Sequence, residues 1–247
     1  MAHKVSLLGI CGSPRRRGNS WFLLGHALDA AREALPVQVE AEAYSLSGKT
    51  ITGCDGCSRC RELGGCRHED DFQELRDKWL AADAIVYSVP VYHMNLPGQL
   101  HCFLDRLGNS LPGPEQKYLK PVGAIAQGAH LFSGQEAAIL TLVQHALIMG
   151  CVPVSGDMWQ SYIGAGGWTQ SSSGTRTLEK LYESGDPVAQ AAVAAATSLG
   201  RRVAQLALLI KAGADTYREF LSKDRTYQAL VAALPPSPGD RYTLPGG

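Results

Sequence analysis

The sequence predicts an α/β fold in which helices cover both faces of a parallel sheet. Short and almost continuous apolar runs recur over the first 157 residues, alternating with segments whose apolar residues repeat at helical spacing. Strands that are apolar on both faces are typical of a parallel sheet buried between two helical layers. A glycine-rich loop directly follows the first run, and ligands of such sheets bind at the carboxyl ends of the strands.

The first elements form a strand-loop-helix unit followed by a second strand. Residues 4–10 read as a buried strand, and the segment 21–35 after the glycine-rich loop has the apolar spacing of a helix. Residues 37–44 alternate in period two, which indicates a strand. Farther along, Asp70 or Asp71 can cap the next helix, because aspartate is a preferred residue at helix N-termini.

The alternation of strands and helices continues to residue 154. Ser133 and Glu136 have the spacing of a capping box, which predicts that a helix begins there. The predicted elements are a strand at 84–89, a short helix at 99–107, a strand at 122–126, a helix ending near Gly150 and a fifth strand at 151–154.

The remaining chain forms an extension. Residues 159–184 are rich in Gly, Ser and Thr, which predicts a long mobile loop that could act as a lid. Asp186-Pro187 predicts the start of a long helix that reaches about Ala212. We therefore expect a ligand-binding domain at 1–157 with a cysteine loop at 54–66, a loop and helical extension at 158–234 that serves oligomerisation, and a flexible tail at 235–247.

Composition excludes several classes of function. Lys and Arg together equal Asp and Glu at 23 each, so no net charge attracts nucleic acid or an anionic membrane. The sequence has no apolar run of the roughly 20 residues that span a bilayer and no leader pattern, so we expect a cytoplasmic protein. In a reducing compartment, seven cysteines with four crowded together favour metal ligation over disulfides.

The cysteine loop has the spacing Cys54-x2-Cys57-x2-Cys60-x5-Cys66. A cubane cluster needs one thiolate for each of four irons, and this spacing suits a [4Fe-4S] cluster better than a single zinc ion. Zinc, unmetallated thiols and a redox disulfide are the alternatives. The other three cysteines lie in or beside apolar elements and receive no role; they are Cys11, Cys102 and Cys151.

The loop Gly12 to Ser20 is a candidate phosphate site, because a helix N-terminus presents unpaired N–H groups and a positive dipole end. Its candidate ligands are Ser13, Arg15, Asn19 and Ser20. The loop matches neither a nucleotide-triphosphate loop nor a dinucleotide fingerprint, so a single terminal phosphate is the better ligand. The alternative is that these side chains are only turn and cap residues.

Two further loops follow strands at the same edge of the predicted sheet. The first is apolar and aromatic, and a flat ring could lie against it; its candidate contacts are Pro90, Val91, Tyr92, His93, Met94 and Asn95. The second allows a close backbone approach to the edge of a planar heterocycle, with the candidates Gln127, Gly128 and Ala129. Tyr92 could instead be a packed aromatic residue, and His93 and His130 plain polar loop residues.

Several motifs together resemble the NADPH-dependent FMN reductase family of flavodoxin-like proteins. They are Gly12-Ser13-Pro14-Arg15 with Gly18-Asn19-Ser20, the run Ser88 to Tyr92, Leu104-Asp105-Arg106, and Ser133-Gly134-Gln135-Glu136. The four-cysteine loop is similar to that of the iron-sulfur flavoprotein branch. The resemblance covers about residues 4–157.

This resemblance implies a flavodoxin-like, doubly wound, five-stranded parallel sheet of order 2-1-3-4-5, with a C-terminal helical extension. It implies FMN with its phosphate at the glycine-rich loop and its ring beside Pro90 to Asn95, and a [4Fe-4S] cluster on Cys54, Cys57, Cys60 and Cys66. It also implies a homodimer or homotetramer with the flavin near a subunit interface.

The leading hypothesis is an electron-transferring flavoprotein in which the cofactors carry the chemistry, so no catalytic side chain is named. NAD(P)H or reduced ferredoxin would be the donor, and the acceptor is a small molecule or a protein. The alternatives are a cluster-free NAD(P)H-dependent reductase of FMN or quinones and a non-enzymatic binding module whose cysteines hold zinc.

Overall fold

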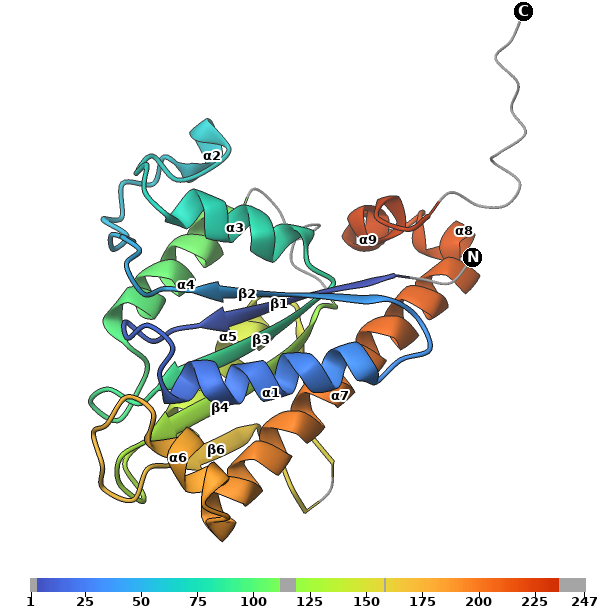
Figure 1. Ribbon diagram of the computed structural model, residues 1–247. Helices are drawn as coiled ribbons and strands as arrows, with labels where there is room; N and C mark the ends of the chain where they lie inside the picture. Colours follow the sequence, from blue (N-terminus) through green and yellow to red (C-terminus); the bar gives the residue numbers. More distant parts are fainter. Residues whose placement is uncertain (1–3, 112–118, 158, 236–247) are drawn as a thin grey trace, which may run out of the picture.

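The computed structural model describes residues 4–111, 119–157 and 159–235, and it has a parallel sheet at its centre (Figure 1). The strand order is β2-β1-β3-β4-β5, with a sixth strand, β6, also paired to β4. The predicted order 2-1-3-4-5 is therefore confirmed. The predicted tail, apart from Pro235, lies outside the described residues.

Burial along the strands explains why the sequence revealed them. The four long strands are β1 (Val5–Cys11), β2 (Val39–Ser45), β3 (Ala84–Pro90) and β4 (Pro121–Gly128). Every residue of β3 and β4 is buried, which accounts for their almost unbroken apolar sequences. The edge strand β2 instead alternates between exposed and partly buried residues along most of its length.

Two short strands share the fifth position of the sheet. β5 (Val152–Pro153) pairs with the start of β4, and β6 (Ala165–Trp168) pairs with its end. The predicted strand at 151–154 is thus shorter than expected. The prediction of one long loop over 159–184 was wrong, since this segment contains β6 and a helix, α6 (Thr177–Glu183).

Helices cover the two faces of the sheet separately (Figure 1). Helices α3 (Phe72–Ala81), α4 (Gly98–Ser110) and α5 (Gln135–Ile148) pack on one face, and α1 (Asn19–Glu33), α6 and α7 (Pro187–Thr216) pack on the other. The remaining short helices are α2 (Cys60–Leu63) in the cysteine loop and α8 (Arg218–Leu221), η2 (Arg225–Tyr227) and α9 (Gln228–Ala232) at the C-terminal end.

The predicted helix starts differ in how well they agree with the structure. The Asp186 side chain accepts hydrogen bonds from the backbone N–H groups of Val188 and Ala189, as expected for the start of α7. The prediction of a capping box at Ser133 was wrong. α5 begins after Gly134, whose φ of 108° is left-handed, and the Ser133 hydroxyl donates to the carbonyl of His130 instead.

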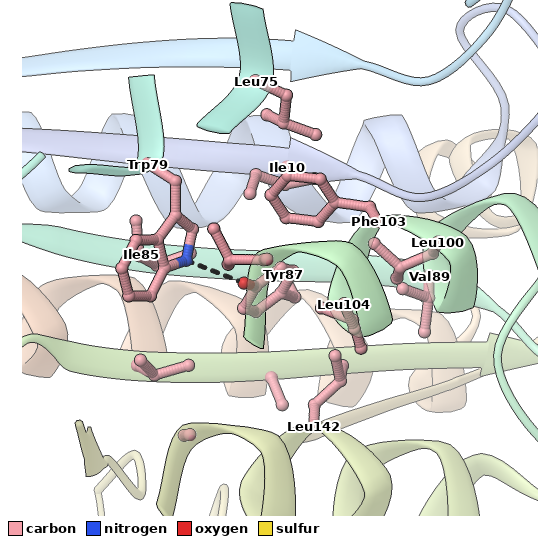
Figure 2. Close-up of a cluster of buried hydrophobic side chains, with 14 of the residues drawn as sticks. Ile10, Leu75, Trp79, Ile85, Tyr87, Val89, Leu100, Phe103, Leu104 and Leu142 are labelled. Carbon is pink, nitrogen blue, oxygen red and sulfur yellow. Dashed lines mark hydrogen bonds between the residues drawn. The ribbon is translucent and has the colours of Figure 1, made fainter. Parts of the chain in front are cut away.

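The larger core lies between the sheet and helices α3, α4 and α5 (Figure 2). Its most buried polar contact is a 2.9 Å hydrogen bond from Trp79 Nε1 to the hydroxyl of Tyr87. Both side chains are almost completely buried, so this bond satisfies two groups that would otherwise be costly to remove from water. It fixes α3 against β3.

The second core is dominated by the contact of α1 with α7. Gly200 of α7 lies so close to α1 that a Cβ atom there would be 2.0 Å from the carbonyl oxygen of Ala27.

α7 is also long and apolar enough to cross a membrane, contrary to our expectation from the sequence. Half of its most apolar window is buried within this chain.

The helix contact yields a test of the fold. Replacing Gly200 with Ala should lower the free energy of unfolding by about 3 kcal/mol, because the new methyl group must push the two helices apart. Gly213→Ala is the matched control on the same helix, where a Cβ meets nothing within 4 Å. It should raise stability by about 1 kcal/mol through helix propensity. Urea unfolding of both variants measures the difference, and equal stabilities would contradict the packing described.

Candidate functional site

The loops after β1, β3 and β4 meet at the carboxyl edge of the sheet, as predicted, and line one pocket of about 120 Å³. Segment 169–175, which follows β6, forms its fourth side. The candidate residues that line the pocket are Ser13, Arg15, Asn19, Pro90, Val91, Tyr92, Gln127, Gly128 and Ala129. Ser20, His93, Met94 and Asn95 do not line it.

The glycine-rich loop forms the floor of the pocket and presents backbone N–H groups with positive partial charge. Gly18 precedes α1, so the first N–H groups of this 15-residue helix have no partner within the helix. The hydroxyl oxygen of buried Ser13 accepts a 3.1 Å hydrogen bond from the N–H of Arg15, which holds the turn. Among the described residues no carboxylate lines the pocket. Burial raises the pKa of the nearby Cys11 thiol to about 11, so that thiol adds no negative charge.

The other two phosphate candidates have partners in the structure. Ser20 is buried behind the pocket, where its hydroxyl accepts a 3.3 Å hydrogen bond from Gln127 Nε2. Its carbonyl accepts a second hydrogen bond, of 2.8 Å, from the hydroxyl of Ser88. Asn19 lines the pocket but also binds the segment beyond β6, with its amide nitrogen 3.0 Å from the carbonyl oxygen of Gly174.

The loop after β3 contains a tight turn at the rim of the pocket. Tyr92 and Asn95 exchange two backbone hydrogen bonds of 2.8 and 2.9 Å. The two residues between them, His93 and Met94, have φ values of 45° and 65°, a left-handed conformation that is strained for residues with side chains. The turn leaves Tyr92 partly exposed at the rim and directs Asn95 toward Thr141, whose hydroxyl is 2.9 Å from Asn95 Oδ1.

The fourth side of the pocket was missed by the sequence analysis. Thr169 and residues 172–175 line the pocket together with the predicted loops. Their Ser, Thr and Gly content was read as the sign of a mobile loop, although the same residue types also supply hydroxyl and backbone donors for an anion. Only the pairing of β6 with β4 brings them to this edge.

The cysteine loop is closed by a neck of hydrogen bonds between its two ends. The backbone N–H of Thr50 donates to Asp71 (2.7 Å) and that of Thr52 to Asp70 (2.9 Å). The carbonyl of Thr50 accepts a 3.0 Å hydrogen bond from the N–H of Asp71. Lys49 adds ion pairs with Asp71 at 3.0 Å and Glu74 at 2.8 Å. The loop therefore leaves and rejoins the domain at one point.

Arg106 of α4 holds this neck from the inside. Its side chain is completely buried, 2.6 Å from the carboxylate of Asp70, and it also donates to the carbonyl of Thr52 (3.2 Å) and that of His68 (2.8 Å). Burial alone would raise the pKa of Asp70, but hydrogen bonds, first among them that from Arg106, lower it to about 2. The guanidinium group stacks on the ring of Phe72, 4.2 Å from its centre.

All four cysteines of the loop line one pocket of about 450 Å³. Burial, followed by repulsion from Cys66, Cys57 and Cys54, raises the pKa of the Cys60 thiol, so Cys60 lies near enough to the other three to interact with them electrostatically. Such a donor set fits a positively charged metal centre, which compensates thiolate charge. Within the described ranges, no three His, Cys, Asp or Glu side chains form a group that could hold a single metal ion.

Polar groups around the cysteine pocket tie the far part of the loop to its end. Asp55 forms an ion pair with Arg67, and its carboxylate lies 3.1 Å from Nε2 of His68. Hydrogen bonding from Arg67 keeps the pKa of the Asp55 carboxyl well below its usual range. The N–H of Cys57 donates to the same carboxylate at 3.2 Å. Asp55 thus ties the backbone at Cys57 to the end of the loop.

Comparisons with known proteins agree with this geometry. The model of the NADPH-dependent FMN reductase family matches residues 5–163. An iron-sulfur flavoprotein of Archaeoglobus fulgidus is 33% identical over 178 residues, which cover 72% of this chain and 87% of the relative. An iron-sulfur flavoprotein of Methanocaldococcus jannaschii is 31% identical over 207 residues, which cover 84% of this chain and 100% of the relative.

Solved structures share the fold. A structure of RosB with a bound riboflavin-phosphate intermediate has a TM-score of 0.63 at 18% identity and covers 87% of both chains. A flavone reductase has a TM-score of 0.57 at 23% identity, covering 84% of this chain and 64% of the other. At such identities the likeness concerns the arrangement of helices and strands.

The depressed pKa of Asp70 predicts a loss of stability in acid. A carboxyl group whose folded pKa lies below its unfolded value stabilises the fold above about pH 4, and this contribution disappears as pH falls toward 2. The free energy of unfolding should decline over this window by roughly 2 kcal/mol more in the natural protein than in Asp70→Asn. Denaturant titrations at several pH values measure it, and parallel curves for the two proteins would refute this role for Asp70.

Proposed function

Because the chain belongs to the NADPH-dependent FMN reductase family, and within it to the iron-sulfur flavoprotein branch, we propose that it passes electrons through FMN and a [4Fe-4S] cluster. As a member of this family, the chain is a flavin oxidoreductase with an electron donor and an acceptor. The cluster, its ligands and the flavin contacts are the proposal. The observation that carries it is the convergence of four cysteines on one pocket at the end of α4, whose other end adjoins the flavin loops.

For FMN, the proposed phosphate site is the floor formed by the glycine-rich loop. The N–H groups at the start of α1 and the side chains of Ser13, Arg15 and Asn19 supply the donors, while Ser20 supports the loop from behind. A pocket of about 120 Å³ is smaller than the usual range for sites that enclose a whole ligand of this size. We therefore assign the ring to the rim, beside Pro90, Val91 and Tyr92.

The other flavin candidates have supporting roles in this proposal. His93, Met94 and Asn95 form the tight turn that presents Tyr92, and Met94 is 57% exposed at the rim. Gln127, Gly128 and Ala129 line the side of the pocket and offer backbone groups to the ring edge. A Cβ at Gly128 would lie 2.8 Å from the side chains of Gln135 and Ser133, so a larger residue there would displace these two polar groups.

For the cluster, the proposed ligands are Cys54, Cys57, Cys60 and Cys66. When bound, FMN exchanges electrons in pairs and the cluster exchanges them singly, so together they connect donors and acceptors of the two kinds. The protein holds the cysteine loop through the neck and Arg106. Gly98 begins α4 next to the ring loop, and Arg106 lies about 12 Å farther along the helix axis, so one rigid element positions both sites.

Self-association is part of the proposal, because α5 exposes an apolar stripe to solvent. Leu140 is 46%, Leu147 60% and Ile148 80% exposed, and their spacing places them on one side of the helix. Phe132, which precedes α5, is 90% exposed. Contiguous exposed apolar side chains of this size favour a protein interface. We propose a homodimer or homotetramer that uses this stripe. NAD(P)H or ferredoxin as donor and a cytoplasmic location remain predictions.

An absorption spectrum tests the cofactors. Anaerobically purified protein should have flavin bands and a broad visible absorption that bleaches on reduction. Cys57→Ala should erase the broad component and keep the flavin, because the cluster loses one of its four ligands. Cys102→Ser is the matched control and should retain both, since this cysteine lies on α4 outside the four. Flavin bands alone in the natural protein would instead favour a cluster-free FMN or quinone reductase.

Light scattering coupled to gel filtration tests the interface. The natural protein should have two or four times the 26.4 kDa mass of one chain, and Leu147→Glu should shift it toward a single chain, because a buried unpaired charge is costly. Leu209→Glu is the control: Leu209 is 67% exposed on α7 and lies outside the stripe. A natural protein with the mass of one chain would refute the interface.

A further inference from the structure

We propose that segment 169–175, which we call the strap, closes the phosphate end of the flavin site and thereby selects FMN over FAD. The inference rests on the proposed binding of FMN and adds a specificity determinant to it. The strap lies in the extension that follows β6, outside the three loops from which the sequence analysis built the site (Figure 1). Its role follows from how it is tied to both sides of the pocket.

On one side, the strap continues the pairing of β6 with β4. The N–H of Thr169 donates to the carbonyl of Gly128 (3.0 Å), and the N–H of Ser171 donates to that of Ala129 (2.6 Å). The ring of His130 is 3.2 Å from the hydroxyl of Ser171. These bonds attach the strap to the loop that we assign to the flavin ring edge.

On the other side, the strap is bound by two of the phosphate candidates. Arg15 Nη1 donates to the carbonyl of Ser173 at 2.7 Å, and Asn19 Nδ2 donates to the carbonyl of Gly174 at 3.0 Å. Asn19 Oδ1 also accepts a 3.0 Å hydrogen bond from the N–H of Leu178, at the start of α6. The strap therefore crosses from the ring-edge loop to the glycine-rich loop.

Internal hydrogen bonds give the strap a defined shape. The hydroxyl of Ser172 accepts from the N–H of Gly174 at 3.2 Å and is 2.9 Å from the hydroxyl of Thr177. The hydroxyl of Thr169 donates to the carbonyl of Ser172 at 2.5 Å. A segment of small polar residues thus becomes an ordered wall, and its Ser172, Ser173, Gly174 and Thr175 face the pocket.

The strap lies where the second nucleotide of a dinucleotide would have to extend out of the site. A monoester ends at its phosphate, and Arg15 still has donors for it after binding Ser173, because a guanidinium group carries five N–H groups. In FAD the phosphate continues into a second nucleotide. At Gly18 a Cβ would already be 3.4 Å from the carbonyl oxygen of Thr175, so the strap closes over the loop. A pocket of about 120 Å³ has no room for an adenosine group beside the phosphate.

The test compares flavins on the full chain after its flavin has been removed. Fluorescence titration should give FMN an affinity at least about 100-fold higher than FAD in the natural protein. The double variant Ser172→Ala/Thr177→Val removes these two hydroxyl groups while nearly keeping side-chain shape. Losing their three hydrogen bonds, between the two hydroxyls and to the N–H and carbonyl of Gly174, should reduce this preference and speed FMN release, each by about tenfold. Ser184→Ala, a hydroxyl in the same extension bonded to a carbonyl of α6, should change neither.

A second measurement uses the natural protein only. Arg176 directly follows the strap, and its side chain is 63% exposed, so trypsin can report on this segment. Saturating FMN should slow cleavage after Arg176 several-fold, whereas riboflavin, which lacks the phosphate, should not. Cleavage after Lys223, with a side chain 72% exposed, serves as the reference site.

The possible failures are distinguishable. A natural protein that binds no flavin overturns the proposed function itself. A natural protein that binds FMN but binds FAD equally well overturns the strap proposal alone, and so does a double variant with natural circular dichroism, preference and release rate. If the double variant does not fold, the cleavage experiment decides: equal protection at Arg176 by FMN and riboflavin overturns the proposal.

Discussion

The buried ion pair between Arg106 and Asp70 is the constraint on which the cysteine site depends. A charged guanidinium group removed from water is costly unless carboxylate and carbonyl groups surround it, and here these come from both ends of the cysteine loop. The pair therefore cannot form unless Thr52, His68 and Asp70 come together. This requirement fixes where the loop leaves the sheet, even though the loop contributes few apolar residues to the core.

The same helix that carries Arg106 also begins at the loop assigned to the flavin ring. α4 is packed through Leu100, Phe103 and Leu107 into the core shown in Figure 2, so it cannot shift without disturbing β3. The geometry relating the two sites is thereby set by core packing, which is stiff. Such a division suits a protein whose side chains hold cofactors and do not themselves react.

The sequence predicted the parts of the molecule that depend on local patterns. The unbroken apolar runs of β3 and β4, the helix start at Asp186 and the glycine-rich loop need no knowledge of distant residues. The failures all involve contacts between distant segments. Gly134 takes a left-handed conformation close to the backbone of Met94, which displaces the expected capping box. Arg106 appeared only within a family motif, because its partners come from another part of the chain. The strap has the composition of a disordered linker, and hydrogen bonds to the distant loops after β4 and β1 help to order it.

Because β5 and β6 share the fifth position of the sheet, they limit where this protein can be truncated. The family model matches residues 5–163 and so stops just before β6, yet β6, α6 and α7 supply much of the second core. A fragment that stopped there would leave the end of β4 as an open edge and uncover the apolar side of α1, a combination that promotes aggregation. A fragment that keeps β4 paired and α1 covered must therefore extend beyond the stretch that the family model matches and include β6, α6 and α7.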